Sequence, residues 1–213
     1  MIQSAPGLIL RTRLLTESSL IVNWLTPKFG RISTVAKGAR RAKSPFLGKL
    51  DLFYEADLSF SRSRRSELHT LREICLRDTH PALRQDLGLL QQAAYGAALI
   101  EQTTETDTPL PEIFALFSGF LNSLSLQPPK PRTIFAFELK LLRLLGQHPD
   151  LGRSRLPPDA RELVRALAQT DWKKLGELSA TASQARAVNQ FLHGFLIFHL
   201  GKIPKARGAA LKP

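Results

Sequence analysis

The sequence predicts an α+β protein, with a five-stranded OB-fold barrel over residues 1–80 and an all-α domain over residues 81–213. Two observations predict it. Apolar residues alternate with polar ones in the first part, as they do along half-buried strands. From residue 81 onward they recur every three or four positions, as they do on one face of a helix. The change of period marks the expected domain boundary.

Five stretches of the first part are candidate strands. They are Gly7–Leu15, Ser19–Thr26, Gly30–Lys37, Lys49–Ser61 and Glu67–Arg77. The fourth has the clearest period of two, with Phe53 as the exception, and predicts one long half-buried strand. Short antiparallel strands of this kind are expected to curve into a small barrel, and the OB-fold is such a five-stranded barrel.

The second part predicts a series of helices separated by proline-rich breaks. They cover residues 81–104, 113–124, 134–145, 159–169 and 171–178, with a long last helix after them. In the first of these, the expected apolar face consists of Leu83, Leu87, Leu90, Ala94 and Ala97. Pro157 and Pro158 are placed to open a helix, and Ser183 is the expected cap of the last one.

The charge of the chain indicates a polyanionic partner. Lys and Arg number 30 against 18 Asp and Glu, which gives a net charge of +12. Nucleic acid, an anionic membrane or an acidic protein segment fits this excess, and a merely soluble basic protein is the alternative. Residues 1–50 carry nine of the cations and only one acid, Glu17. The last residues form a second basic stretch, which ends the helical domain.

Enzyme chemistry has no support in the sequence. There is no glycine-rich phosphate loop, and the five histidines show no ligand spacing. One cysteine, Cys75, excludes an internal disulfide and is expected to be buried in a strand. We therefore expect no enzyme activity, cofactor or metal. No apolar run is long enough for a transmembrane helix, and the start is unlike a signal peptide, so a cytoplasmic protein is expected.

The stretch "VAKGARRAKS", Val35–Ser44, indicates a surface that binds nucleic acid. Adjacent strands and one connecting loop are expected to supply its cations: Arg11, Arg13, Arg31, Lys37, Arg40, Arg41, Lys43 and Lys49. Such a set can follow a phosphate backbone, which predicts sequence-tolerant, salt-sensitive binding. Phe46 is the best candidate for base stacking, ahead of Trp24 and Phe53.

At this point the residues resemble a known family, the bacterial recombination mediator RecO. The resemblance begins with "ESSLIVNWLTPKFGRISTVAKGARRAKSPFLGKLDLF", Glu17–Phe53, of which VAKGARR is the specific part. "FELKLLRLLGQHPDL", Phe137–Leu151, resembles the family's central helix. "FLHGFLIFHLGKIPKARGAALKP" resembles its last helix and basic tail. Many relatives carry a cysteine-containing insert after the second stretch, sometimes zinc-binding, whereas this chain has Ser154 and no cysteine there, which implies no metal.

The resemblance implies a fold and a role. The fold is an OB domain followed by a helical domain. The role is to bind single- and double-stranded DNA, to anneal complementary strands, and to work with RecR in loading recombinase on strands coated by single-strand-binding protein, at the nucleoid. The acidic tail of that coat protein docks near the start of the central helix in the family, where Arg132, Phe137 and Lys140 are the candidates here.

A second function remains open from the residues alone. An RNA-binding OB-fold protein of the ribosome or translation type would also be basic, and it would prefer structured RNA. The large helical domain favours the first interpretation, because it indicates protein partners.

Overall fold

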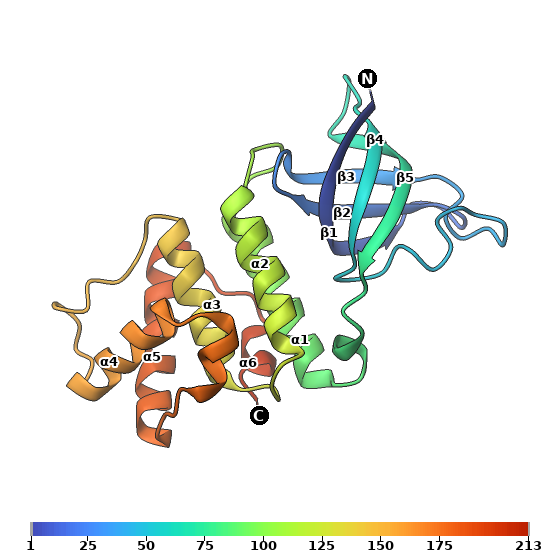
Figure 1. The fold of residues 1–213 in the computed structure, drawn as a ribbon. Coiled ribbons are helices and arrows are strands. Elements are labelled where there is room, and N and C mark those ends of the chain that lie inside the picture. The colour runs from blue at the N-terminus through green and yellow to red at the C-terminus, as the bar shows by residue number, and fades with distance from the viewer. Residues whose placement is uncertain (1, 213) are drawn as a thin grey trace. The chain divides into compact units, whose positions relative to one another are not determined.

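The computed structural model describes residues 2–212, which divide into two compact units. The first unit runs up to Pro81 and takes in Thr104–Ala115. The second comprises Ala82–Thr103 and the residues from Leu116 onward. The segment 104–115, which the sequence pattern assigns to the helical part, is thus counted with the barrel. Figure 1 shows the barrel strands from blue to green and the later helices from yellow to red.

Five strands form the closed barrel of the first unit. They are β1 (Ile2–Leu14), β2 (Leu20–Thr26), β3 (Gly30–Ala36), β4 (Glu55–Ser61) and β5 (Leu68–Asp78). Their order around the barrel is β1-β2-β3-β5-β4. The predicted five-stranded barrel followed by helices is therefore confirmed.

One pair of strands differs from the prediction that all are antiparallel. β3 and β5 pair in parallel, with Ser33 opposite Leu68, while the other four pairs are antiparallel. The reason is geometric. In a closed ring with an odd number of strands, the direction cannot alternate at every step, so one neighbouring pair must run in parallel.

The fourth strand is shorter than its alternating sequence predicts, because it begins at Glu55 rather than Lys49. Phe53 has a positive φ of 65°, which turns the chain just before the strand. Its backbone N–H donates to the carbonyl of Ile9 at 2.8 Å, and its ring is buried. Leu50 and Tyr54 pack on the barrel core from a loop. Leu50 and Tyr54 are apolar because they cover the core, and not because they belong to a strand.

Trp24 lies at the centre of the barrel core. Its side chain is fully buried, and its indole N–H donates to the hydroxyl of Thr34 at 2.9 Å, so the buried polar atom is satisfied. Ile9, Val22 and Phe60 belong to the same cluster. On β5, Cys75 is exposed, so the expectation that it is buried was wrong. It lies on the side of the strand that faces away from this cluster.

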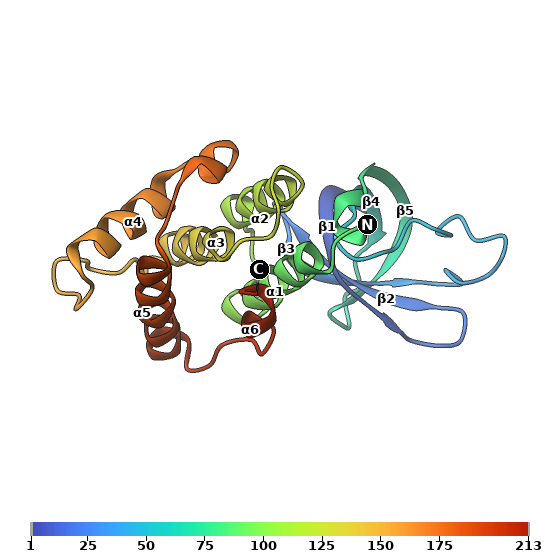
Figure 2. The ribbon, with the colours of Figure 1, turned by 90° about the horizontal axis from the view of Figure 1, so that it is seen from below.

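The barrel strands are followed by helices that the proline-punctuated sequence predicts well. They are η1 (Pro81–Arg84), α1 (Leu87–Thr103), α2 (Pro111–Leu124), α3 (Pro131–Leu144), α4 (Pro158–Gln169), η2 (Trp172–Glu177), α5 (Ala182–Leu200) and α6 (Arg207–Ala210). Figure 2 shows α4 and α5 lying against α3. The cap of α5 is Thr181, not Ser183, and Thr181 forms a reciprocal capping box with Gln184.

The first long helix buries only part of the face expected for it, since Ala97 is buried and Leu90 is half-buried. Leu87 is 69% exposed and Ala94 is also exposed, whereas Tyr95, Leu99 and Ile100 are buried. Both α3 and α6 pack on α1. The buried surface is therefore broad and partly polar, and simple apolar spacing does not identify it.

A buried ion pair fixes the C-terminal segment of the helical unit. The Arg207 guanidinium donates to both carboxylate oxygens of Glu138, from Nε at 2.7 Å and from Nη2 at 3.0 Å. The Tyr95 hydroxyl donates to the same carboxylate at 2.6 Å, and Asn189 accepts from Arg207 at 2.8 Å. Burial lowers the pKa of Arg207, but the hydrogen bonds and charge of Glu138 outweigh it and raise the pKa. Arg207 therefore serves the fold rather than the basic tail.

Candidate nucleic-acid interface

The cationic loop after β3 is bonded to the tip of the β1–β2 hairpin. The backbone N–H of Arg40 donates to the Ser18 carbonyl at 3.0 Å, and its guanidinium donates to the Glu17 carbonyl at 2.9 Å. The N–H of Gly38 donates to the hydroxyl of Ser19 at 3.1 Å. The loop and the hairpin project from the same side of the barrel in Figures 1 and 2. They therefore present their side chains as one surface.

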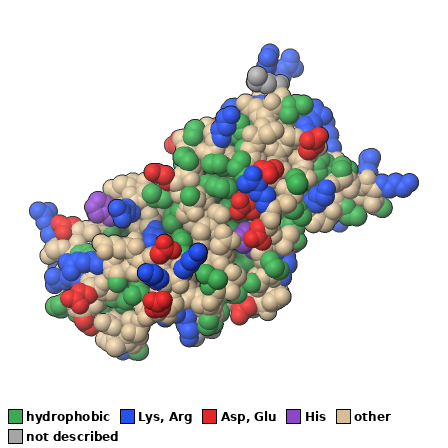
Figure 3. All heavy atoms as spheres, viewed as in Figure 1, with side chains coloured by type: hydrophobic (Ala, Val, Ile, Leu, Met, Phe, Trp, Pro, Cys, Tyr) green, Lys and Arg blue, Asp and Glu red, His purple; other side chains and the backbone are tan. Residues whose placement is uncertain are grey.

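This surface carries a group of exposed cations, here named the basic edge. It consists of Arg13, Lys37, Arg40, Arg41 and Lys43, all of them exposed. Arg13 is opposite Ile21 on β2, which is opposite Val35 on β3, so register places the end of β1 beside the start of the loop. Figure 3 shows Lys and Arg side chains at this projecting end. The basic edge brings together five of the cations that the sequence predicted.

The loop has a defined backbone rather than a free course. Gly38 begins it with a positive φ of 65°, a conformation that glycine adopts without strain. Three turns follow, in which the N–H groups of Arg41, Ser44 and Leu47 each donate to the carbonyl three residues earlier, at 3.0–3.2 Å. The short turns keep Arg40, Arg41 and Lys43 close together on the surface.

The expected stacking role of Phe46 was wrong. Phe46 is only 7% exposed and belongs to the barrel core. Trp24 and Phe53 are also buried. The loop exposes Leu47 instead, at 57%. Beside the basic edge, Phe46, Leu47 and Arg40 line part of a hollow of about 420 Å³.

The remaining predicted cations lie apart from the basic edge. Arg31 is at the other end of β3, about 20 Å from Lys37 at the usual rise per residue. Its guanidinium donates to the Thr104 carbonyl and its own carbonyl accepts from Asp107, so it holds the segment 104–107 on the barrel. Arg11 is exposed on the outer wall opposite Asn23, and Lys49 is half-buried at the end of the loop turns.

Sequence reasoning missed a second cationic loop, between β4 and β5. Its arginines are Arg62, Arg64 and Arg65, and we name residues 62–67 the arginine loop. All three are exposed. In the sequence, the density of arginines in "RSRRS", Arg62–Ser66, is a usable signal for this loop.

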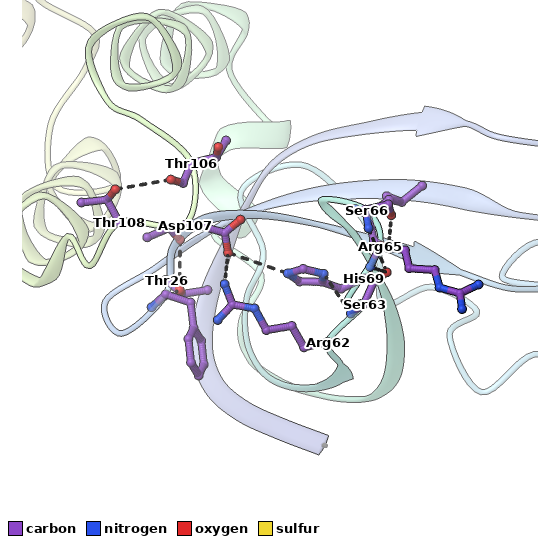
Figure 4. Close-up of polar contacts among 12 residues, drawn as sticks. Thr26, Arg62, Ser63, Arg65, Ser66, His69, Thr106, Asp107 and Thr108 are labelled. Carbon is purple, nitrogen blue, oxygen red and sulfur yellow. Dashed lines mark hydrogen bonds and ion pairs between the residues drawn. The ribbon is translucent and has the colours of Figure 1, made fainter.

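The arginine loop is anchored at its base by a buried histidine and an aspartate. Arg62 donates to Asp107 at 2.9 Å, and the ring of His69 accepts from the N–H of Ser63 at 3.4 Å. Figure 4 shows Arg62 and His69 both directed at Asp107. Burial lowers the pKa of His69 despite the charge of Asp107. His69 is thus held neutral, and it accepts a hydrogen bond from the loop.

The helical unit has a small pocket at the start of α3. Its volume is about 140 Å³, and its lining includes Lys130, Pro131, Arg132 and Phe135. Arg132 donates to the Leu178 carbonyl at 2.8 Å, so it also supports the pocket wall. Here we name this site the α3 pocket.

Two of the three residues expected at that place do not line the α3 pocket. Phe137 is fully buried, with its ring centroid 4.4 Å from that of Phe120. Lys140 donates to the Ala168 carbonyl at 3.2 Å and lies over the ring of Trp172. Along α3, residues 137 and 140 face the core and η2 instead, because at 3.6 residues per turn they are rotated around the helix by about 140° and about 80° from Arg132.

Within residues 2–212, no group of three or more His, Cys, Asp or Glu side chains is arranged to hold a metal ion. None of the helices described for those residues is both long enough and apolar enough to cross a membrane.

Barrel and helices together define a class: proteins in which a small five-stranded barrel with a cationic edge precedes a helical domain. Two family models match the chain, "Recombination protein O N terminal" over residues 1–80 and "Recombination protein O C terminal" over residues 84–154. The chain therefore belongs to the RecO family.

Individual relatives agree with this assignment. A "DNA repair protein RecO" of Rhodopirellula baltica is 34% identical over 147 residues, which are 69% of this chain and 54% of the relative. One of Anaeromyxobacter is 34% identical over 68% of this chain and 57% of the relative. One of Exiguobacterium sibiricum is 32% identical over 71% and 60%. The chain thus spans little more than half the length of these relatives.

Proposed function

We propose that this protein is a non-enzymatic recombination mediator that binds DNA through the basic edge of its barrel. The observation that carries the proposal is the group of five exposed cations, held in place by the bonds of Arg40 to the β1–β2 hairpin. Phosphate contacts position a protein on DNA without reading its sequence. The three aromatic side chains considered for stacking are buried, which leaves the phosphate contacts as the main source of affinity.

The proposed action is annealing of complementary strands. Two phosphate backbones repel each other, and a cationic surface that contacts both lowers this repulsion by replacing their counterions. Belonging to the RecO family supports this action, together with RecR as a partner and the loading of recombinase as the outcome.

The α3 pocket is the proposed contact for the acidic tail of single-strand-binding protein. An apolar wall that includes Phe135 and Leu163 suits the apolar end of such a tail, and Lys130 and Arg132 suit its carboxylates. In this proposal the pocket replaces the expected set, of which Phe137 and Lys140 lie elsewhere.

The first test removes two cations of the basic edge. We expect the double variant Arg40→Ala, Arg41→Ala to bind single-stranded DNA more weakly and to lower the slope of log affinity against log salt by about one to 1.4 units. Fluorescence anisotropy with a labelled oligonucleotide at several salt concentrations measures both effects.

The matched control is Arg165→Ala, Arg186→Ala, which removes the same charge from exposed positions of the helical unit. We expect a much smaller change in the salt slope for this variant. Equal slopes for the two double variants would show that net charge matters and that the basic edge does not.

A further inference from the structure

The outer wall of the barrel joins the basic edge to the arginine loop. Two rows of residues cross its strands in register. One row is Arg13, Ile21, Val35 and Thr70, and the other is Arg11, Asn23, Ser33 and Leu68. Neither row contains an acidic residue. In the first row Ile21 and Val35 are buried, so a polyanion on this wall meets mainly the second row, which carries Arg11 and no acid.

The arginine loop is built to hold its shape. The hydroxyl of Ser63 accepts from the N–H groups of Arg65 and Ser66, both at 3.2 Å. The hydroxyl of Ser66 accepts from the N–H of Leu68 at 3.1 Å. Together with the Arg62–Asp107 ion pair, these bonds fix the backbone from which Arg64 and Arg65 extend into solvent. A preorganised loop loses little entropy when it binds.

A neighbouring arginine adds to the cationic character of the loop. Arg72 on β5 donates to the hydroxyl of Ser61 at 2.7 Å, which places it beside the base of the loop. Against these arginines the loop itself carries a single acid, Glu67.

We propose that the arginine loop is a second phosphate-binding site, which extends the DNA path along the outer wall of the barrel from the basic edge. The inference rests on the proposed function. β3 and β5 run in parallel, so the arginine loop lies near the Arg31 end of β3 and the basic edge lies at the Lys37 end. That separation is about 20 Å. It corresponds to about six phosphates along one strand of a duplex.

The experiment measures affinity against oligonucleotide length. Oligothymidines of increasing length, from about three nucleotides, too short to reach both sites, to about thirty, are bound to the wild-type protein and to Arg64→Ala, Arg65→Ala. For the wild type we expect affinity to rise until a strand reaches both sites. The variant is expected to match the wild type on the shortest strands, to level off sooner, and to have a salt slope lower by about 1.4 units on the longest strands.

Two further variants separate a binding role from a structural one. Arg64→Lys, Arg65→Lys retains the charge and is expected to keep most of the affinity for long strands. Glu67→Gln removes the acid of the loop and is expected to strengthen binding to long strands. If the loop served only the fold, Glu67→Gln would not strengthen DNA binding while Arg64→Ala, Arg65→Ala weakens it.

The outcomes distinguish this inference from the function on which it rests. If the wild type does not bind DNA, or if the variant at Arg40 and Arg41 binds normally, the proposed function fails. If those results are as expected but Arg64→Ala, Arg65→Ala follows the wild type at every length, only the arginine-loop site is refuted. The arginine-loop site is also refuted if Arg64→Ala, Arg65→Ala loses binding to an acidic peptide while its DNA binding is unchanged. That result would assign the loop to a protein partner.

Discussion

Arg207 and Arg40 belong to the same basic chain, and burial gives them different roles. Arg40 is exposed, so its charge remains available to a ligand while part of its guanidinium holds the hairpin. Arg207 is 6% exposed and neutralises Glu138, which is fully buried. A count of charges treats the two alike. Their difference depends on a partner 69 residues away in the sequence, which a local pattern cannot identify.

The ion pair of Arg207 leads to a prediction about stability. Arg207→Ala is expected to lower the free energy of unfolding by about 3–5 kcal/mol, because it leaves the Glu138 carboxylate buried without its counterion. Chemical denaturation followed by circular dichroism measures the loss. Arg186→Ala on the exposed side of α5 is the control, with an expected change within about 0.5 kcal/mol. Similar values for the two variants would contradict the structural role of Arg207.

At the scale of elements, the sequence predicts what local chemistry determines. The turn at Pro27–Gly30 and the start of α4 at Pro158 follow from residues that restrict the backbone, and both are observed. Residues 50–54 show the limit, because an alternating apolar pattern also fits a loop that covers a core. The basic edge was predictable from its charge density. The burial of Phe46 was not, because it depends on how the barrel closes.

The segment 104–110 is an element whose position depends on one glycine. Gly30 has a positive φ of 63°, and a Cβ there would lie 1.7 Å from the carbonyl oxygen of Thr108. Gly30→Ala is therefore expected to destabilise the barrel unit by about 2–4 kcal/mol, through both backbone strain and displacement of the segment. Urea denaturation, followed by the fluorescence of the buried Trp24, measures the effect.

Gly48 provides the matched control for this prediction. It also has a positive φ, of 71°, but a Cβ there would meet nothing within 4 Å. Gly48→Ala is expected to destabilise by only about 1–2 kcal/mol, the cost of the conformation alone. Equal losses at the two glycines would mean that contact with the segment contributes nothing.

For the whole molecule, the proposal assigns DNA to the barrel unit and a protein tail to the helical unit. The two assignments predict different defects. A change at the basic edge affects every DNA substrate and depends on salt. A change at the α3 pocket affects only DNA that carries the coat protein.

Annealing separates these two contributions. The wild type is expected to accelerate annealing of complementary oligonucleotides coated with single-strand-binding protein, and the acceleration is expected to fade as salt is raised. Lys130→Glu is expected to lose acceleration on coated strands but to keep it on bare strands, because it opposes the acidic tail. A stopped-flow assay with fluorescent strands gives both rates. Equal losses on coated and bare strands would remove the α3 pocket from the mechanism.

The parallel pairing of β3 with β5 also has a consequence for the order of events during synthesis. β1, β2 and β3 pair with their sequence neighbours, so they can form a meander as soon as they leave the ribosome. The ring stays open until β5 emerges, because β5 supplies the pairing partner on the far side of β3. Pairing across a long stretch of chain is slow to form. Until then the nascent meander carries its cations beside an uncovered apolar face.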